Sequence, residues 1–344
     1  MIKTYNLTNP EREIRYEHID VIRGLAILLV VLGHSIGNEA NPLNKFILAF
    51  HMPLFFILSG ALAKTGHNVN FKTLILKKTR TLLIPQVTLG VITYLYDILI
   101  EVFIQGNSSV FDFNLLGYIL QWWFLIVLFF AEILFYIISK NINLQKNKGK
   151  LLVFGLFFTL TLMIQLYPSK VDGVPLHLDI LPMGFLFFLL GYYFSNLIKS
   201  KALKNYDLNG GFLMLIPILM IISNLNLPVT MYNNEYGNLL LFGISSLLGI
   251  YLTHILGWHL KDNLYLEFLG KNSVIIYVLQ FKVIQIVRRV VIILFSTLSE
   301  STVEYIQYLL IFIISTIILM TFTVVCDKYL GFLFGKKAKY HRLK

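Results

Sequence analysis

The sequence predicts an all-α integral membrane protein, a bundle of about ten transmembrane helices with both termini in the cytoplasm. Hydrophobic residues make up 57% of the 344 residues and charged residues only 14%, with a mean hydropathy of +0.72. A soluble globular domain carries about 25% charged residues. Apolar runs of about 20 residues, the length that crosses a bilayer as a helix, recur along the whole chain. The polar stretches between them are too short to fold alone, so residues 1–344 form one predicted membrane-embedded domain.

Each apolar run predicts one helix. Residues 1–18 precede the first run and carry charges of both signs, without the basic start, apolar core and cleavage site of a signal peptide. They form a predicted cytoplasmic segment, and the basic residues 328–344 form a predicted cytoplasmic tail. The predicted helices span residues 19–37, 45–64, 82–104, 115–138, 151–167, 178–198, 210–225, 237–258, 273–294 and 305–327.

The distribution of lysine and arginine predicts the orientation. Cytoplasmic loops of membrane proteins are enriched in these residues, and the chain alternates between basic and nearly uncharged loops. The net charge of +11 therefore reflects cytoplasmic loops, and no nucleic-acid partner is expected. The basic loops are 65–81, 139–150, 199–209 and 259–272. The loops with no lysine or arginine are 105–114, 226–236 and 295–304, and 168–177 has one, Lys170.

The first predicted helix carries an arginine and a histidine in the segment DVIRGLAILLVVLGH. Arg23 and His34 are 11 residues apart. This spacing is about three helical turns, so both side chains point the same way, about 16 Å apart along the axis. Ionisable groups inside a membrane usually mark a functional site or a polar cavity. The alternative is an arginine that reaches the membrane surface and a hydrogen-bonded histidine in the core.

Several polar or aromatic residues on other helices fall at the predicted depth of His34. His51 lies on the second predicted helix, Asp97 on the third, Trp123 on the fourth and Arg289 on the ninth. Each also has a structural interpretation: an aromatic belt for the tryptophan, an ion-pair partner for the aspartate, and a surface anchor for the arginine. Together they predict a polar layer near the outer surface, since unpaired charge at that depth costs several kcal/mol.

A basic cluster precedes the third predicted helix on the cytoplasmic side. It consists of Lys77, Lys78 and Arg80. Lysine and arginine bind phosphate groups well, so the cluster is a candidate phosphate site. Its alternative role is an ordinary anchor at the cytoplasmic surface. The single cysteine, Cys326, excludes an intramolecular disulfide and a cysteine-based metal cluster, and no metal site is expected.

Five segments resemble motifs of the membrane acyltransferase-3 family, which includes bacterial envelope O-acyltransferases of the fucose 4-O-acetylase type. The order of the segments and the ten-helix layout also match. Two positions depart from the family pattern: Gln280 stands where the family commonly has histidine, and Lys77-x-x-Arg80 replaces a pair of arginines. The five segments are DVIRGLAILLVVLGH, AFHMPLFFILSGALAK (49–64), KKTRTLLIP (77–85), WWFLIVLF (122–129) and LGKNSVIIYVLQ (269–280).

The resemblance implies O-acyl transfer from a cytoplasmic acyl-CoA, in particular acetyl-CoA, to a hydroxyl of a cell-envelope or exopolysaccharide sugar. Acyl-CoA would be a co-substrate, with no bound cofactor. Lys77, Lys78 and Arg80 would hold its phosphates, and Arg23 would steer it towards the outer layer. The expected setting is a bacterial plasma membrane, and the expected partners are the lipid bilayer, acyl-CoA and the glycan acceptor.

The resemblance also implies roles for the outer layer. His34 would act as general base, or carry the acyl group transiently. His51 or Arg289 would stabilise the developing oxyanion. Trp123 and Asp97 would contact the sugar. The alternative function is a transporter of polysaccharide or lipid-linked sugar, which the intramembrane charges would also suit.

Overall fold

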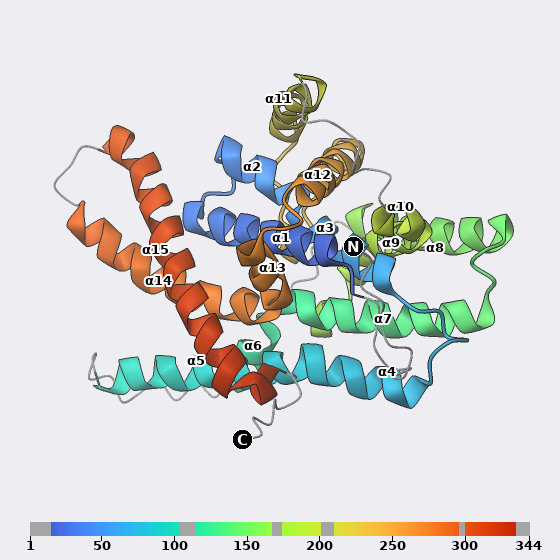
Figure 1. Cartoon of the computed structure of the whole chain (residues 1–344), viewed down its shortest axis with the longest axis horizontal. Coiled ribbons are helices and arrows are strands. Elements are labelled where there is room, and N and C mark those ends of the chain that lie inside the picture. Colours follow the sequence, from blue (N-terminus) through green and yellow to red (C-terminus); the bar gives the residue numbers. More distant parts are fainter. Residues whose placement is uncertain (1–14, 104–113, 167–173, 201–209, 296–299, 335–344) are drawn as a thin grey trace, which may run out of the picture.

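In the computed structural model, the described parts of the chain are residues 15–103, 114–166, 174–200, 210–295 and 300–334 (Figure 1). These residues are helical or irregular, with a single isolated bridge between Thr230 and Glu235 and no strand among them. The predicted all-α class is therefore confirmed. Most of the predicted N-terminal segment and of the basic tail, and much of four predicted loops, lie outside the described residues.

Every predicted helix corresponds to helical residues, although several are divided. The short turns are π-helical at 79–83 and 3₁₀-helical elsewhere. The elements are α1 (Glu17–Ile36), α2 (Pro42–Leu48), α3 (His51–Leu62), α4 (Phe71–Lys78), η1 (Thr79–Leu83), α5 (Ile84–Phe103), α6 (Leu115–Leu120), α7 (Trp123–Asn141), α8 (Asn147–Leu166), η2 (Pro175–His177), α9 (Leu181–Tyr193), α10 (Ser195–Lys199), α11 (Gly210–Leu225), η4 (Met231–Asn233), α12 (Leu239–His259), α13 (Leu264–Lys271), α14 (Ser273–Leu294), α15 (Glu300–Tyr329) and η5 (Gly331–Phe334).

Within the described residues, 8 helical segments are long and apolar enough to cross a membrane. Two predicted spans are not among them. The apolar part of α11 is short, and α14 carries Lys282, Arg288 and Arg289 within one window of spanning length. The predicted number of ten spans and the cytoplasmic placement of the termini therefore stay predictions.

The predicted helix 45–64 is divided into α2 and α3 by a break at Phe50. Phe50 leaves the helical region with φ −142°, and α3 begins at His51. Pro53 lies in the first turn of α3, where its missing N–H costs nothing because those donors have no partner within the helix. The break therefore places His51 at a helix N-terminus.

The two helices that carry the histidines pack closely against neighbours through glycines. A Cβ atom added at Gly24 in α1 would lie 2.1 Å from the backbone oxygen of Leu266 in α13. One added at Gly60 in α3 would lie 1.9 Å from the backbone oxygen of Phe188 in α9. Small residues allow this backbone approach in membrane helices, and a larger side chain at either glycine would force the pair apart.

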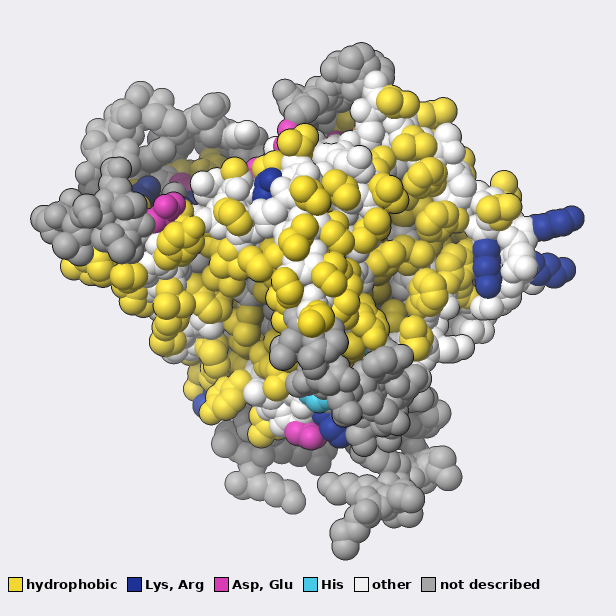
Figure 2. Space-filling view, turned by 90° about the horizontal axis from the view of Figure 1, so that it is seen from above, with side chains coloured by type: hydrophobic (Ala, Val, Ile, Leu, Met, Phe, Trp, Pro, Cys, Tyr) yellow, Lys and Arg dark blue, Asp and Glu magenta, His cyan; other side chains and the backbone are white. Residues whose placement is uncertain are grey.

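The surface is largely apolar, as expected of a protein in a bilayer. Figure 2 shows one face on which hydrophobic side chains predominate over most of the area. On α8, Leu151, Leu156 and Met163 are among the exposed hydrophobic side chains. Continuous apolar surface of this extent is rare on soluble monomers. Together with the apolar helices, it identifies a membrane protein.

Candidate active site

His34 lies in the last turn of α1 and is partly buried. Its ring packs against the ring of Phe281 in α14, with 4.4 Å between the centroids. Among the described residues, neither ring nitrogen of His34 has a hydrogen-bond partner. The imidazole is thus held in place by packing and by its backbone, and its nitrogens are free to exchange a proton with a substrate.

Arg288 fixes the backbone at His34. Its Nη2 atom donates hydrogen bonds to the backbone oxygens of His34 at 2.6 Å and Ser35 at 2.9 Å. These carbonyls lie at the C-terminal end of α1, where a cation is favourable and the last oxygens lack partners within the helix. Arg289, the arginine named by the sequence interpretation, is exposed. Arg288, and not Arg289, is therefore the arginine that contacts the His34 segment.

We expect Arg288→Ala to lower acyl transfer by about tenfold, because two charge-assisted hydrogen bonds that position His34 are lost. Arg289→Ala is the matched control and should keep nearly full activity. The measurement is the ester content of surface glycans in a deletion strain that expresses each variant at equal level. Equal activity of the two variants would contradict the positioning role.

His51 shares the site with His34. It is 6% exposed, and an electrostatic interaction connects the two imidazoles. Its Nδ1 atom lies 3.0 Å from the backbone oxygen of Ile47. A carbonyl only accepts, so Nδ1 carries the hydrogen, and Nε2 of the neutral ring is an acceptor. His51 therefore donates to an oxyanion from Nε2 only when the ring is protonated.

Aromatic side chains form the wall beside His34. Trp122 is 1% exposed and contacts the rings of Tyr277 and Phe281, at centroid distances of 5.9 and 5.3 Å. Phe281 in turn contacts His34. Trp123 is also buried, with its ring edge-on to Phe124. Trp122 is thus the nearer of the two tryptophans in this series of ring contacts, and Trp123 joins it only through Phe124 and Tyr277.

Asp97 is an ion-pair partner. Lys282 Nζ lies 2.7 and 2.6 Å from its two carboxylate oxygens, which links α14 to α5. Lys282 follows Phe281 directly, so this pair lies close to the His34 wall. The sequence interpretation placed Asp97 in the outer layer, and the structure pairs it with Lys282. A carboxylate held by two such hydrogen bonds stabilises the helix pair.

The opposite end of α1 carries a second charged cluster. Arg23 Nη1 lies 3.8 Å from Asp20, which also accepts a hydrogen bond from Arg15 Nε at 2.6 Å. Arg23 further interacts electrostatically with Glu132 of α7. Glu132 is 6% exposed and forms an ion pair with Lys78, beside the π-helical turn η1. A buried carboxylate thus lies between two cations that are far apart in the sequence.

The sequence interpretation missed Glu132, although a signal was present. It is the only charged residue in the apolar stretch 122–139, and such residues inside a span are usually functional. Lys77 and Arg80 are exposed, so only Lys78 of the predicted basic cluster reaches the buried carboxylate. Gln280 is fully buried, and neither amide atom has a partner among the described residues.

Comparison with known proteins identifies the family. The family described as "Acyltransferase domain" (acyltransferase 3) matches residues 16–327. The nodulation protein NolL of Sinorhizobium fredii (strain NBRC 101917 / NGR234) is 28% identical over 196 residues, which cover 53% of this chain and 50% of that protein. The chain thus spans about half the length of this relative. No solved structure matches significantly. Since the match extends over nearly all of the helices that could span a membrane, the chain belongs to the acyltransferase 3 family.

Proposed function

We propose that the protein transfers an acyl group, in particular acetyl, from cytoplasmic acyl-CoA to a hydroxyl of a cell-envelope or exopolysaccharide sugar. It would act in a bacterial plasma membrane with both termini in the cytoplasm. The observation that carries the proposal is the placement of two functional groups on α1. Arg23 lies within a charged cluster at one end, and His34, with free ring nitrogens, lies about 16 Å away on the same face.

His34 would act as the general base. Its imidazole removes the proton of the sugar hydroxyl, and the oxygen attacks the thioester carbonyl. The carbon–sulfur bond then breaks, the CoA thiolate takes the proton from the imidazolium, and the products are the sugar ester and CoA. Attack by His34 itself, through an acyl-histidine, gives the same products. His51, when protonated, would donate to the oxyanion.

The charged cluster would receive the CoA phosphates. Lys78, together with the exposed Lys77 and Arg80, supplies cations where α4 passes into η1. Arg23 would guide the pantetheine arm along α1, towards His34. Two features support this assignment: Glu132 forms an ion pair with Lys78 and interacts electrostatically with Arg23, and the distance from Arg23 to His34 suits an extended arm.

The test uses membranes that contain the protein and acetyl-CoA labelled in the acetyl group. Label should move to the glycan fraction and be released by mild alkali, which cleaves esters. Membranes with His34→Ala serve as the control. Movement of unlabelled glycan across the membrane, without label transfer, would support the alternative transporter and overturn the proposal.

A further inference from the structure

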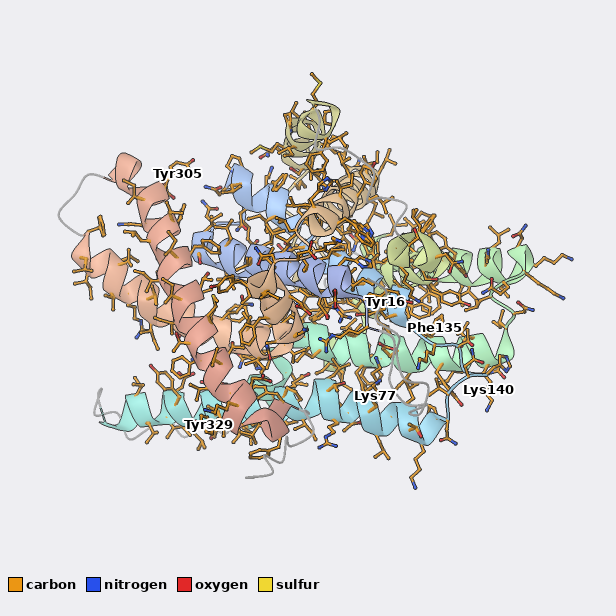
Figure 3. All side chains as sticks on the ribbon, viewed as in Figure 1. Tyr16, Lys77, Phe135, Lys140, Tyr305 and Tyr329 are labelled. Atoms are coloured by element: carbon orange, nitrogen blue, oxygen red, sulfur yellow. The ribbon has the colours of Figure 1, made fainter. Side chains whose placement is uncertain are left out.

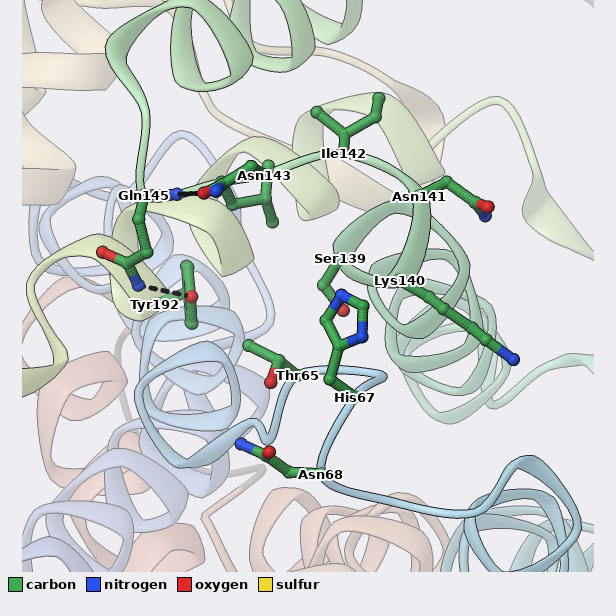
Figure 4. A pocket seen from close by; sticks show the side chains of 11 residues that line it. Thr65, His67, Asn68, Ser139, Lys140, Asn141, Ile142, Asn143, Gln145 and Tyr192 are labelled. Carbon is green, nitrogen blue, oxygen red and sulfur yellow. Dashed lines mark hydrogen bonds between the residues drawn. The ribbon is translucent and has the colours of Figure 1, made fainter.

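A polar pocket lies between the 65–68 loop and the turn that joins α7 to α8 (Figure 4). Its volume is about 490 Å³, within the usual size range of small-molecule sites. The mechanism proposed above does not use it. The lining residues are Thr65, His67, Asn68, Ser139, Lys140, Asn141, Ile142, Asn143, Leu144, Gln145 and Tyr192.

Hydrogen bonds hold the walls of this pocket. The backbone N–H of Gly66 donates to Ser139 Oγ at 2.8 Å, which fixes the 65–68 loop against the end of α7. On the opposite wall, Gln145 Nε2 donates to the hydroxyl of Tyr192 at 2.9 Å. The backbone N–H of Gln145 also donates to Asn143 Oδ1 at 2.9 Å (Figure 4). The cavity therefore exists without a ligand.

The lining has the chemistry of a nucleotide site. None of the lining residues is acidic, and several carry side-chain amides. Asn and Gln amides recognise adenine by paired hydrogen bonds to its base edge. Lys140 is one of the lining residues, and its Nζ atom lies 5.9 Å from the centroid of the Tyr136 ring. Among the described residues no carboxylate lies within 4.0 Å of this Nζ atom, so the side chain can turn towards a ligand at the rim. Its flexible side chain is a point charge suited to phosphate.

The pocket lies further along α7 in the direction of the predicted cytoplasmic side. Lys140 follows Glu132 by eight residues, about 12 Å along the helix. Between them, the ring of Tyr136 contacts Phe71 of α4 at a centroid distance of 5.0 Å. Figure 3 shows Lys77 and Lys140 on the side of the molecule away from Tyr305 of α15. The Lys78–Glu132 pair thus lies between the pocket and the His34 end.

We propose that this pocket binds the adenosine 3′-phosphate end of acyl-CoA, with Lys140 at the 3′-phosphate and the amides at the adenine. The inference rests on the proposed function and adds the nucleotide subsite to it. With the adenosine in the pocket, the diphosphate reaches Lys78 and the pantetheine arm continues along α1. The order of groups in CoA then matches the order of the sites along the molecule.

Two donors that differ in one phosphate test this assignment. For the wild type, acetyl-CoA should have a KM about fivefold lower than acetyl-3′-dephospho-CoA, as expected for one exposed ion pair with added hydrogen bonds. Lys140→Gln should raise the KM of acetyl-CoA and remove the difference. Lys148→Gln, which changes a lysine in the first turn of α8 outside the pocket, should leave the difference intact.

A second variant fills the cavity without changing its charge. Thr65→Phe should raise the KM of both donors together, with kcat retained, because the adenosine is common to both. An unchanged ratio of the two KM values in Lys140→Gln, or an unchanged KM in Thr65→Phe, would overturn the subsite while leaving acyl transfer from CoA established. Absence of transfer from acetyl-CoA in the wild type would overturn both proposals.

Discussion

His34→Ala should lower acyl transfer by about a hundredfold or more, because general-base catalysis by a positioned imidazole contributes at least that much. The substitution removes the ring but leaves α1 intact, since Arg288 bonds the backbone oxygen of residue 34 and not its side chain. Transfer of label from acetyl-CoA to glycan, per amount of protein in the membrane, is the measurement.

His259→Ala is the matched control for that experiment. His259 ends α12 and, like His51, has Nδ1 at 3.0 Å from the backbone oxygen four residues before it, but its side chain is exposed. The control variant should keep full activity. Unchanged transfer in His34→Ala, with normal insertion and amount, would exclude His34 as the base or acyl carrier.

Glu132→Leu should destabilise the protein by about 3 kcal/mol, because it leaves Lys78 without its counter-ion at a partly buried position. The Lys78 side chain is 24% exposed and the Glu132 side chain 8%. Transfer should fall as well, since Lys78 and Arg23 lose the carboxylate between them. Thermal unfolding in detergent and the KM of acetyl-CoA are the two measurements.

The double variant Lys78→Met/Glu132→Leu separates stability from function. Replacing both partners of a buried ion pair by apolar residues is often neutral, so the double variant should regain most of the lost stability. Its KM for acetyl-CoA should stay high, because a phosphate-binding cation is gone. A Glu132→Leu variant as stable as the wild type, or a double variant no more stable than the single one, would contradict the importance of this pair.

The sequence was sufficient to predict the long apolar helices, because long apolar runs in a membrane protein have few alternatives. The predicted loops 65–81 and 259–272 were wrong in part, since they contain α4 and α13, which are too short and polar to stand out as apolar runs. It was insufficient to predict how they are divided. The break before His51 depends on Pro53 and on the fit of α2 and α3 against neighbouring helices, which no local pattern encodes. The same holds for the interruption at Trp122, between α6 and α7.

The site was predictable to the extent that single residues were unusual in their surroundings. Arg23 and His34 stood out as ionisable groups in one apolar helix, and the structure gives each a specific environment. The choice between Arg288 and Arg289 was not predictable. Their side chains point about 100° apart around the helix axis, and which of them faces α1 depends on how α14 is rotated in the bundle. The pairing of Lys78 with Glu132 joins residues 54 apart, which only the tertiary structure reveals.

The glycine contacts of α1 and α3 have a consequence for how substrates reach the histidines. At Gly24 and Gly60 the backbones of two helices are in contact. No side chain lies between the helices at these points, so none can change rotamer to let one helix slide past the other. The histidine-bearing helices are therefore the stationary part of the enzyme. Of the two helices that the Asp97–Lys282 ion pair joins, α14 is itself bound to α1 through Arg288. We therefore expect an opening for the acceptor to come from movement of α5, with this ion pair broken.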